Sequence, residues 1–106
     1  MSAQLAASPP QTSPSNVQPR PATVSARFLI VADVDPGMLS RLLEAFAKLG
    51  EAPTRCHASR ETGDGSQLTV DLRGEHLAPR TAELIHFGLR RVLGVHHLVA
   101  VIEPQT

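Results

Sequence analysis

The segment Asp33-Val34-Asp35-Pro36-Gly37 contains the residues of this 106-residue chain best suited to bind a small ligand. A helix that starts here would present free backbone amides and a partial positive charge, which favour a carboxylate or phosphate. Gly37 has no side chain, so a ligand could approach the backbone closely. In the alternative interpretation, Asp35 only caps the helix and Pro36 takes its first position. Asp33 and Asp35 also place negative charge where an anion would bind. Residue types alone leave both interpretations open.

The histidines and the one cysteine do not predict a metal site. Neighbouring strand residues point to opposite faces, so Cys56–His57 and His96–His97 cannot each chelate as a pair. Neither C-x-x-C nor H-x-x-x-H spacing occurs. Cys56 also lacks an oriented base, and we expect it to be a buried, inert thiol. Since no acid–base pair stands near residues 33–37, we expect neither an enzyme nor a cofactor.

Phe87 has two possible roles. On a helix it would lie opposite the buried stripe, among Arg80, Glu83, Arg90 and Arg91. Single exposed apolar residues are common and need no function. An aromatic ring surrounded by arginines can also anchor a protein interface. Both interpretations remain open.

Composition divides the chain into a tail and one folding unit. Residues 1–24 hold five of the nine prolines and a single charged side chain, Arg20. We predict a disordered Pro/Ser/Gln-rich tail, because too little apolar surface is available to offset the entropy of ordering. It does not resemble a signal peptide, and no apolar run is long enough to cross a membrane. With a net charge of zero and no aromatic platform, the chain does not read as a nucleic-acid binder. We expect a soluble cytoplasmic module.

The folding unit, residues 26–103, is poor in large apolar side chains. The chain has no Trp, no Tyr and three Phe. A domain of this size buries only about 60% of its chain surface. We therefore expect it to associate with a partner, most simply a second copy.

Hydrophobic patterns predict six elements. A strand over 27–34 leads into a helix that Asp35 caps, Pro36 opens and Gly50 ends. Its predicted buried side consists of Leu39, Leu42, Leu43, Phe46 and Leu49.

The second half of the chain repeats strand, helix and strand. Strands over 53–61 and 67–74 flank the turn segment TGDGS. A helix opened by Pro79 runs to about Gly94, and a last strand covers 95–103. The predicted buried side of this helix consists of Leu84, Ile85, Gly88, Leu89 and Val92. The order predicts an α+β, ferredoxin-like βαββαβ sandwich: a four-stranded antiparallel sheet with two helices on one face.

A motif around the first helix resembles the ACT domain family. Pro36-Gly37-Met38-Leu39-Ser40-Arg41, followed by Phe46-Ala47 and Gly50, is similar to the P-G-V-L-S-R…F-A…G pattern of the small regulatory subunit of acetolactate synthase. The resemblance covers about residues 26–103. It implies a non-catalytic regulatory domain that pairs side by side by joining sheets, with an amino acid at the interface.

The resemblance also implies the site residues. The strand–helix turn of one chain would contribute Val34, Asp35, Pro36, Gly37, Met38 and Leu39. The start of the second strand of the other chain would contribute Ala52 and Pro53. Amides near Gly37–Leu39 would hold the carboxylate, and Asp33 or Asp35 could hold the ammonium group.

Two positions depart from the family pattern. Val34 and Ala52 stand where the family often has side chains that hydrogen-bond the ligand. Each loss should weaken binding by about 1–3 kcal/mol. From the resemblance, the main hypothesis is that the chain is a regulatory subunit in branched-chain amino-acid synthesis. It would sense valine, leucine or isoleucine and contact a synthase catalytic subunit. The alternative is an assembly domain that has lost its effector site.

Overall fold

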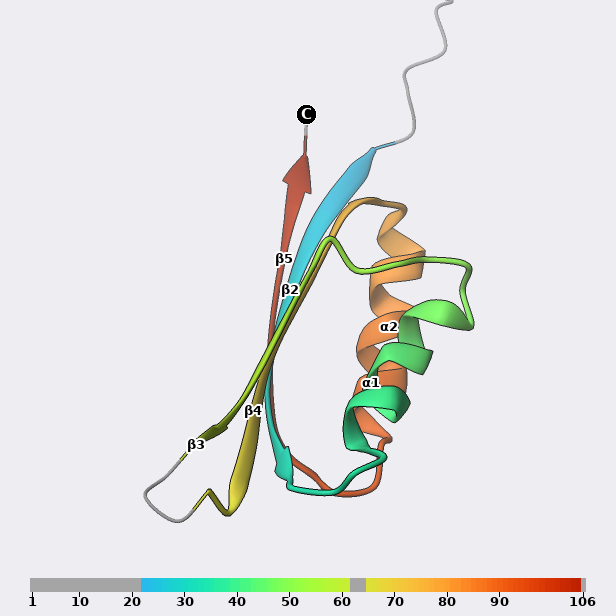
Figure 1. Cartoon of the computed structure of the whole chain (residues 1–106). Helices are drawn as coiled ribbons and strands as arrows, with labels where there is room; N and C mark the ends of the chain where they lie inside the picture. Colours follow the sequence, from blue (N-terminus) through green and yellow to red (C-terminus); the bar gives the residue numbers. More distant parts are fainter. Residues whose placement is uncertain (1–21, 62–64, 106) are drawn as a thin grey trace, which may run out of the picture.

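The fold is the predicted ferredoxin-like βαββαβ sandwich, in a computed structural model that describes residues 22–61 and 65–105. The elements are β2 (Thr23–Asp33), α1 (Met38–Ala47), β3 (Arg55–Glu61), β4 (Gln67–Leu77), α2 (Pro79–Arg90) and β5 (Val95–Gln105). The sheet is antiparallel in the order β3-β4-β2-β5, and both helices cover one face (Figure 1).

The ends of the elements differ modestly from the predicted ranges. β2 begins at Thr23, inside the range predicted as tail, and ends before Val34. The hairpin between β3 and β4 forms, but residues 62–64 of its turn lie outside the described residues, as do residues 1–21 of the tail. Pro79 opens α2 as predicted, and Gly50 has the expected left-handed φ of +74°.

The core lies between the helices and one face of the sheet. β2 alternates strictly, burying Phe28, Ile30 and Ala32 against the helices. Phe28 meets Phe46 of α1 edge to face, with ring centroids 6.1 Å apart. Among the described residues, no polar or charged side chain is buried.

Two residues predicted to be buried on the helices are exposed. Leu49 lies beyond the end of α1, and Leu84 lies on the outer surface between the two helices. The helices come close at Gly88, where an added Cβ would lie 3.3 Å from the Cβ of Ala45. Each helix buries only the side chains that face the sheet. The predicted apolar side of α2 is wider than this buried stripe, so Leu84 at its margin is exposed to solvent.

The prediction that Cys56 is a buried thiol is wrong. Cys56 pairs with Leu72 of β4 and so lies on the helix-covered face of the sheet, whereas His57 pairs with Asp71 on the open face. Cys56 is nonetheless exposed, because β3 is the edge strand next to β4 and the helices do not cover its side chains.

Candidate ligand site at the turn between β2 and α1

Asp35 organises the turn between β2 and α1, but not as the predicted N-cap. Its Oδ1 accepts a hydrogen bond from the amide of Gly37 (3.1 Å), and its carbonyl accepts one from Met38 (2.9 Å). Gly37 is the N-cap and α1 begins at Met38, so Pro36 lies in the turn and not in the helix. The predictions for Asp35 and Pro36 are wrong by two residues, because the Asp side chain closes a tight turn of its own before the helix starts.

The Asp35 carboxylate is engaged by Arg41. An Nη2–H of Arg41 donates to Asp35 Oδ2 at 2.8 Å. The hydrogen bonds from Arg41 and from the Gly37 amide lower the pKa of Asp35 below its ordinary value. The guanidinium also lies against Gly37, where an added Cβ would be 2.9 Å from Arg41 Nη1. A ligand ammonium group would therefore have to compete with Arg41 for Asp35.

The turn leaves amides free one residue later than predicted. The first four amides of a helix have no acceptor within it. Those of Gly37 and Met38 already donate to Asp35. Within the described part of the chain, the amides of Leu39 and Ser40 have no acceptor, so they are the free donors at the start of α1 in place of the predicted set Gly37–Leu39. Sequence reasoning missed Ser40 as a site residue, although the Asp-Pro-Gly turn ahead of it was a usable signal.

Asp33 ties this turn to the loop between α2 and β5. Its amide donates to the carbonyl of Gly94 (2.9 Å), and His96 Nε2 lies 2.6 Å from Asp33 Oδ1. Gly94 has φ +96°, and an added Cβ would lie 2.7 Å from Cε of Met38. Asp33 thus already has a partner. His96 was missed by sequence reasoning, since nothing in its spacing relates it to a residue 63 positions away.

Ala52 and Pro53 lie far from the turn within one chain. They are in the connection from α1 to β3, at the opposite end of α1 from residues 33–37 (Figure 1). A helix of ten residues is about 15 Å long. One chain therefore does not bring the two predicted halves of the site together.

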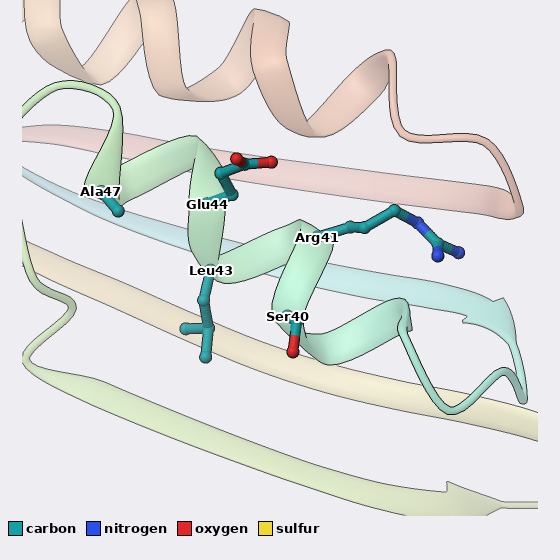
Figure 2. Close-up of a pocket in the computed structure, with 5 residues that line it drawn as sticks. All are labelled: Ser40, Arg41, Leu43, Glu44 and Ala47. Atoms are coloured by element: carbon teal, nitrogen blue, oxygen red, sulfur yellow. The ribbon is translucent and has the colours of Figure 1, made fainter.

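The surface of α1 beside the free amides is hollowed. A shallow depression of about 470 Å³ is lined by Ser40, Arg41, Leu43, Glu44 and Ala47. Figure 2 shows Ser40 and Leu43 on the side that looks toward β3 and β4, with Arg41 and Glu44 pointing away from it. This surface runs from the free amides along α1 toward the connection that holds Ala52.

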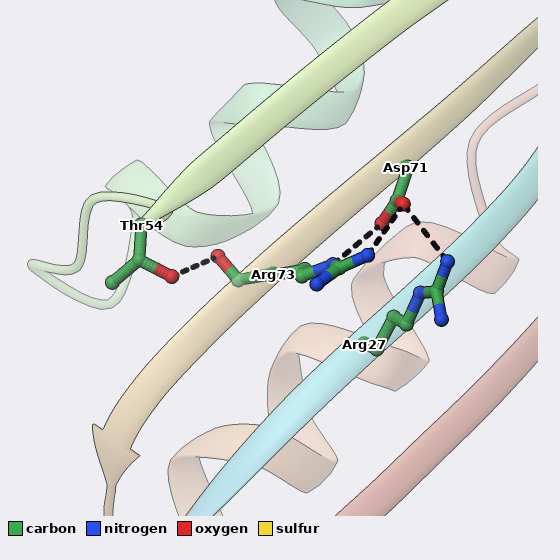
Figure 3. A network of polar contacts seen from close by, with 4 residues as sticks. All are labelled: Arg27, Thr54, Asp71 and Arg73. Carbon is green, nitrogen blue, oxygen red and sulfur yellow. Dashed lines mark hydrogen bonds and ion pairs between the residues drawn. The ribbon is translucent and has the colours of Figure 1, made fainter.

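The start of β3 is fixed to β4. The Thr54 amide and hydroxyl both donate to the carbonyl of Arg73, at 2.7 and 3.2 Å. On the open face, Asp71 accepts hydrogen bonds from Arg73 and from Arg27 of β2 (Figure 3), each pair reaching 3.2 Å. Burial raises the pKa of Asp71, but these hydrogen bonds outweigh it and the net pKa is lowered. The two hydrogen bonds from Thr54 hold the start of β3, which Ala52 and Pro53 precede, and the Asp71 network joins β4 to β2.

The described residues form neither a metal cluster nor a membrane-spanning helix. Within residues 22–61 and 65–105, no three His, Cys, Asp or Glu side chains gather closely enough to hold a metal ion. None of the described helices is long and apolar enough to cross a membrane.

Comparison with known proteins gives one match. The family model described as an ACT-like domain matches residues 19–103, which include all six elements apart from the last residues of β5. No curated protein matches the chain.

Proposed function

The chain belongs to the ACT-like domain family, and from that premise we propose that it is a regulatory module that binds an amino acid at the turn between β2 and α1. Domains of this family are generally regulatory modules for small ligands. The observation that carries the proposal is the pair of free amides at Leu39 and Ser40, beside a carboxylate that Arg41 already neutralises. A ligand carboxylate would accept from these two amides.

A second copy completes the proposed site. Ala52 and Pro53 of that copy would cover the ligand, because the same residues of the first chain follow the far end of α1. Val34, with 38% of its surface exposed, and the ring of Pro36 offer apolar contact beside the amides. Apolar surroundings favour an aliphatic side chain, which fits valine, leucine or isoleucine as the effector.

Thermal melting against the twenty amino acids tests the site. A ligand at a hundred times its Kd stabilises by about 2.7 kcal/mol, which raises Tm by roughly 10 °C in a domain of this size. Ser40→Asp should abolish the shift by repelling the ligand carboxylate, while the new acid at the helix start stabilises α1. Ser40→Asn, neutral and of the same shape, should keep the shift. If no amino acid moves Tm, the proposed site is wrong.

We further propose that the module acts on the catalytic subunit of a synthase in branched-chain amino-acid synthesis. The support is the resemblance of residues 36–50 to the small subunit of acetolactate synthase, together with Phe87 of α2, a residue that is 51% exposed. The purified chain should co-purify with an acetolactate synthase catalytic subunit and change its activity. Phe87→Ala should weaken that association. A catalytic subunit that neither binds nor responds would rule this out.

Val34 and Ala52 favour a second candidate, an assembly domain without an effector. Neither side chain can hydrogen-bond a ligand. The double substitution Val34→Asn with Ala52→Asn distinguishes the two. A gain in amino-acid affinity over wild type would reveal a working but weakened pocket. If added amino acids change the melting curve of neither the wild type nor the double variant, the result would favour an assembly domain without an effector.

A further inference from the structure

A cavity of about 410 Å³ lies between α2 and the edge strand β5. Its lining residues are His86, Arg90, Val95, His96 and Leu98. Val95 and Leu98 are half-buried and form its apolar part. The other three side chains carry nitrogen atoms that can bind an anion. The volume is within the range of small-ligand sites.

Arg90 brings to this cavity a positive charge that the described part of the chain does not neutralise. It is the last residue of α2 and is exposed. Arg27, Arg41 and Arg73 each have a carboxylate at ion-pair distance, whereas no described carboxylate lies that close to Arg90. A guanidinium presents five N–H donors in a fork that matches the oxygens of a phosphate group.

His86 is a second polar group of the cavity without a partner. Its ring packs against Phe28 and Phe87, whose ring centroids lie 6.1 and 6.4 Å away. The residue is half-buried, and in the part of the chain that the structure describes neither ring nitrogen has a hydrogen-bond partner. A neutral imidazole carries one N–H donor and its cation carries two. A bound anion would accept a hydrogen bond that the protein leaves unmade.

A bulge in β5 brings His96 to the same cavity. Val31 pairs with His97 and Ala32 with Val95, so His96 is an extra residue in the strand. Bulges often re-aim a side chain beside a functional site. Here the bulge places a third nitrogen-bearing side chain beside the two from α2.

Asp33 fixes the orientation of the His96 ring. His96 Nε2 lies 2.6 Å from Asp33 Oδ1. Because an ionised carboxylate only accepts hydrogen bonds, Nε2 carries the hydrogen and Nδ1 is left for a ligand. A phosphate group suits both forms of that nitrogen. A phosphate oxygen accepts from a protonated Nδ1, and a P–OH group donates to an unprotonated one.

The end of α2 does not repel an anion, although the last carbonyls of a helix carry a partial negative charge. The carbonyls of Gly88 and Leu89 accept hydrogen bonds from the amides of Arg91 and Val92, each at 3.2 Å. Arg90 and Arg91 add two positive charges at the same end of the helix. The local charge at this end is therefore positive.

We propose that the cavity between α2 and β5 binds the phosphate group of a small molecule through Arg90, His86 and His96. Three nitrogen-bearing side chains match the three strong acceptor oxygens of a phosphate group, whereas a carboxylate has only two oxygens. The cavity is larger than a phosphate ion, so the space beside Val95 and Leu98 accommodates a small apolar part of a phosphate ester. The site is distinct from the proposed amino-acid site and does not depend on it.

An NMR titration of the ¹⁵N-labelled full chain tests the site. The probes are phenyl phosphate, inorganic phosphate and acetate, all at constant ionic strength because salt screens exposed charges. Both phosphates should give saturable shifts of the amide signals of residues 86–98. Tighter binding of phenyl phosphate would assign the site to a phosphate ester, and equal affinity would assign it to free phosphate. No saturable shift with either phosphate, or acetate binding as tightly as they do, overturns the proposal.

Two pairs of neighbouring residues provide matched variants. Arg90→Ala should raise the Kd for phenyl phosphate roughly tenfold or more, because it removes charge-assisted hydrogen bonds. Arg91→Ala removes the same charge from the next residue, which lines the groove between the helices and not this cavity, and should leave the Kd within about twofold. Equal losses in the two variants would indicate nonspecific attraction and contradict the proposal.

The histidine pair separates the two faces of β5. His96→Gln should raise the Kd roughly fivefold, because it removes one of the three nitrogen-bearing side chains of the cavity. His97→Gln changes the next residue, which is absent from the lining of the cavity, and should leave the Kd within about twofold. If His97→Gln weakens binding as much as His96→Gln, the phosphate does not bind in this cavity.

The outcomes for this cavity and for the amino-acid site are separable. Arg90→Ala should keep any melting shift produced by amino acids, because Arg90 lies at the end of α2 and not at the turn between β2 and α1. A melting shift with amino acids but no NMR shift with the phosphates would refute the phosphate site and retain the regulatory site. Saturable phosphate binding without a melting shift would do the reverse.

Discussion

The two edges of the sheet are connected to the helices in different ways. The loop that enters β3 passes through Gly50, where an added Cβ would meet nothing within 4 Å. The loop that enters β5 passes through Gly94, which packs against Met38 and Asp33 at the turn that forms the proposed ligand site. The connection into β3 thus has open space around its glycine, and β3 itself carries Arg55 and Arg60. The other edge, β5, is fixed to the site and is apolar along its free side.

The two edges therefore differ in how directly they contact the turn between β2 and α1. A ligand that moves the turn between β2 and α1 would act directly on the start of β5, through Gly94 and His96. A change at the turn would be transmitted to β3 of the same chain along α1, which lies between them in the chain. The turn between β2 and α1 is therefore in direct contact with the start of β5 within one chain.

The largest expected effect contrasts the two glycines. Both have positive φ, so each Ala substitution should cost about 1 kcal/mol of unfolding free energy in backbone strain. Gly94→Ala also forces Cβ against buried Met38 and should cost about 2 kcal/mol more. Urea unfolding of the two variants measures the difference. Equal losses of unfolding free energy in Gly94→Ala and Gly50→Ala would mean that the loop before β5 accommodates an added methyl group as easily as the loop before β3.

A smaller effect should come from the network beside β3. Asp71→Asn weakens the hydrogen bonds with Arg27 and Arg73 and leaves two guanidinium groups close together, at a cost of about 1 kcal/mol at neutral pH. Because the pKa of Asp71 is lowered on folding, its contribution is complete above the unfolded pKa of about 4 and is lost as pH falls below it.

Urea unfolding from pH 7 to pH 3 checks that sign. The difference in unfolding free energy between wild type and Asp71→Asn should become smaller as the solution becomes acidic. A difference that grew toward low pH would show that the network does not favour the ionised carboxylate.

The left-handed backbone at His76 in β4 should give an effect of about 0.5 kcal/mol on the free energy of unfolding. His76 has φ +55°, and its amide donates to the side chain of Gln105 at 2.6 Å. His76→Gly relieves the left-handed strain but loosens the unfolded chain, so a net gain of about 0.5 kcal/mol is expected. His57→Gly in β3 has no such strain to relieve, so this variant should lose about 0.5 kcal/mol of stability. Calorimetric Tm values compare the two, and a loss in both would contradict the strain argument.

The smallest effect concerns the reactivity of a thiol and not stability. Cys56 is exposed on β3, so it should react with an aromatic disulfide reagent in the native protein almost as fast as in urea. If a second copy covers α1 and β3 when an amino acid binds, labelling should slow when the effector is added. A thiol that reacts only after unfolding would place β3 inside an interface even without ligand.

Local patterns were enough to predict the fold, because strand alternation, helical spacing and turn residues act within a few positions of each other. The apolar run 27–34 correctly predicted most of the strand β2, and Pro79 correctly marked the start of α2. Errors arose where a local pattern was wider than the buried stripe, as at Leu84, or where a side chain competed with the backbone, as at Asp35.

The sequence by itself determined the order of the elements, the start of α2 at Pro79 and the left-handed glycine after α1 at Gly50. Only the tertiary structure decided that Cys56 is exposed, that His96 meets Asp33 and that the free amides are those of Leu39 and Ser40. The physical reason is the same in each case. Exposure and pairing depend on which strand forms the edge and which chain segments far apart in sequence lie together, and no short-range pattern contains that information.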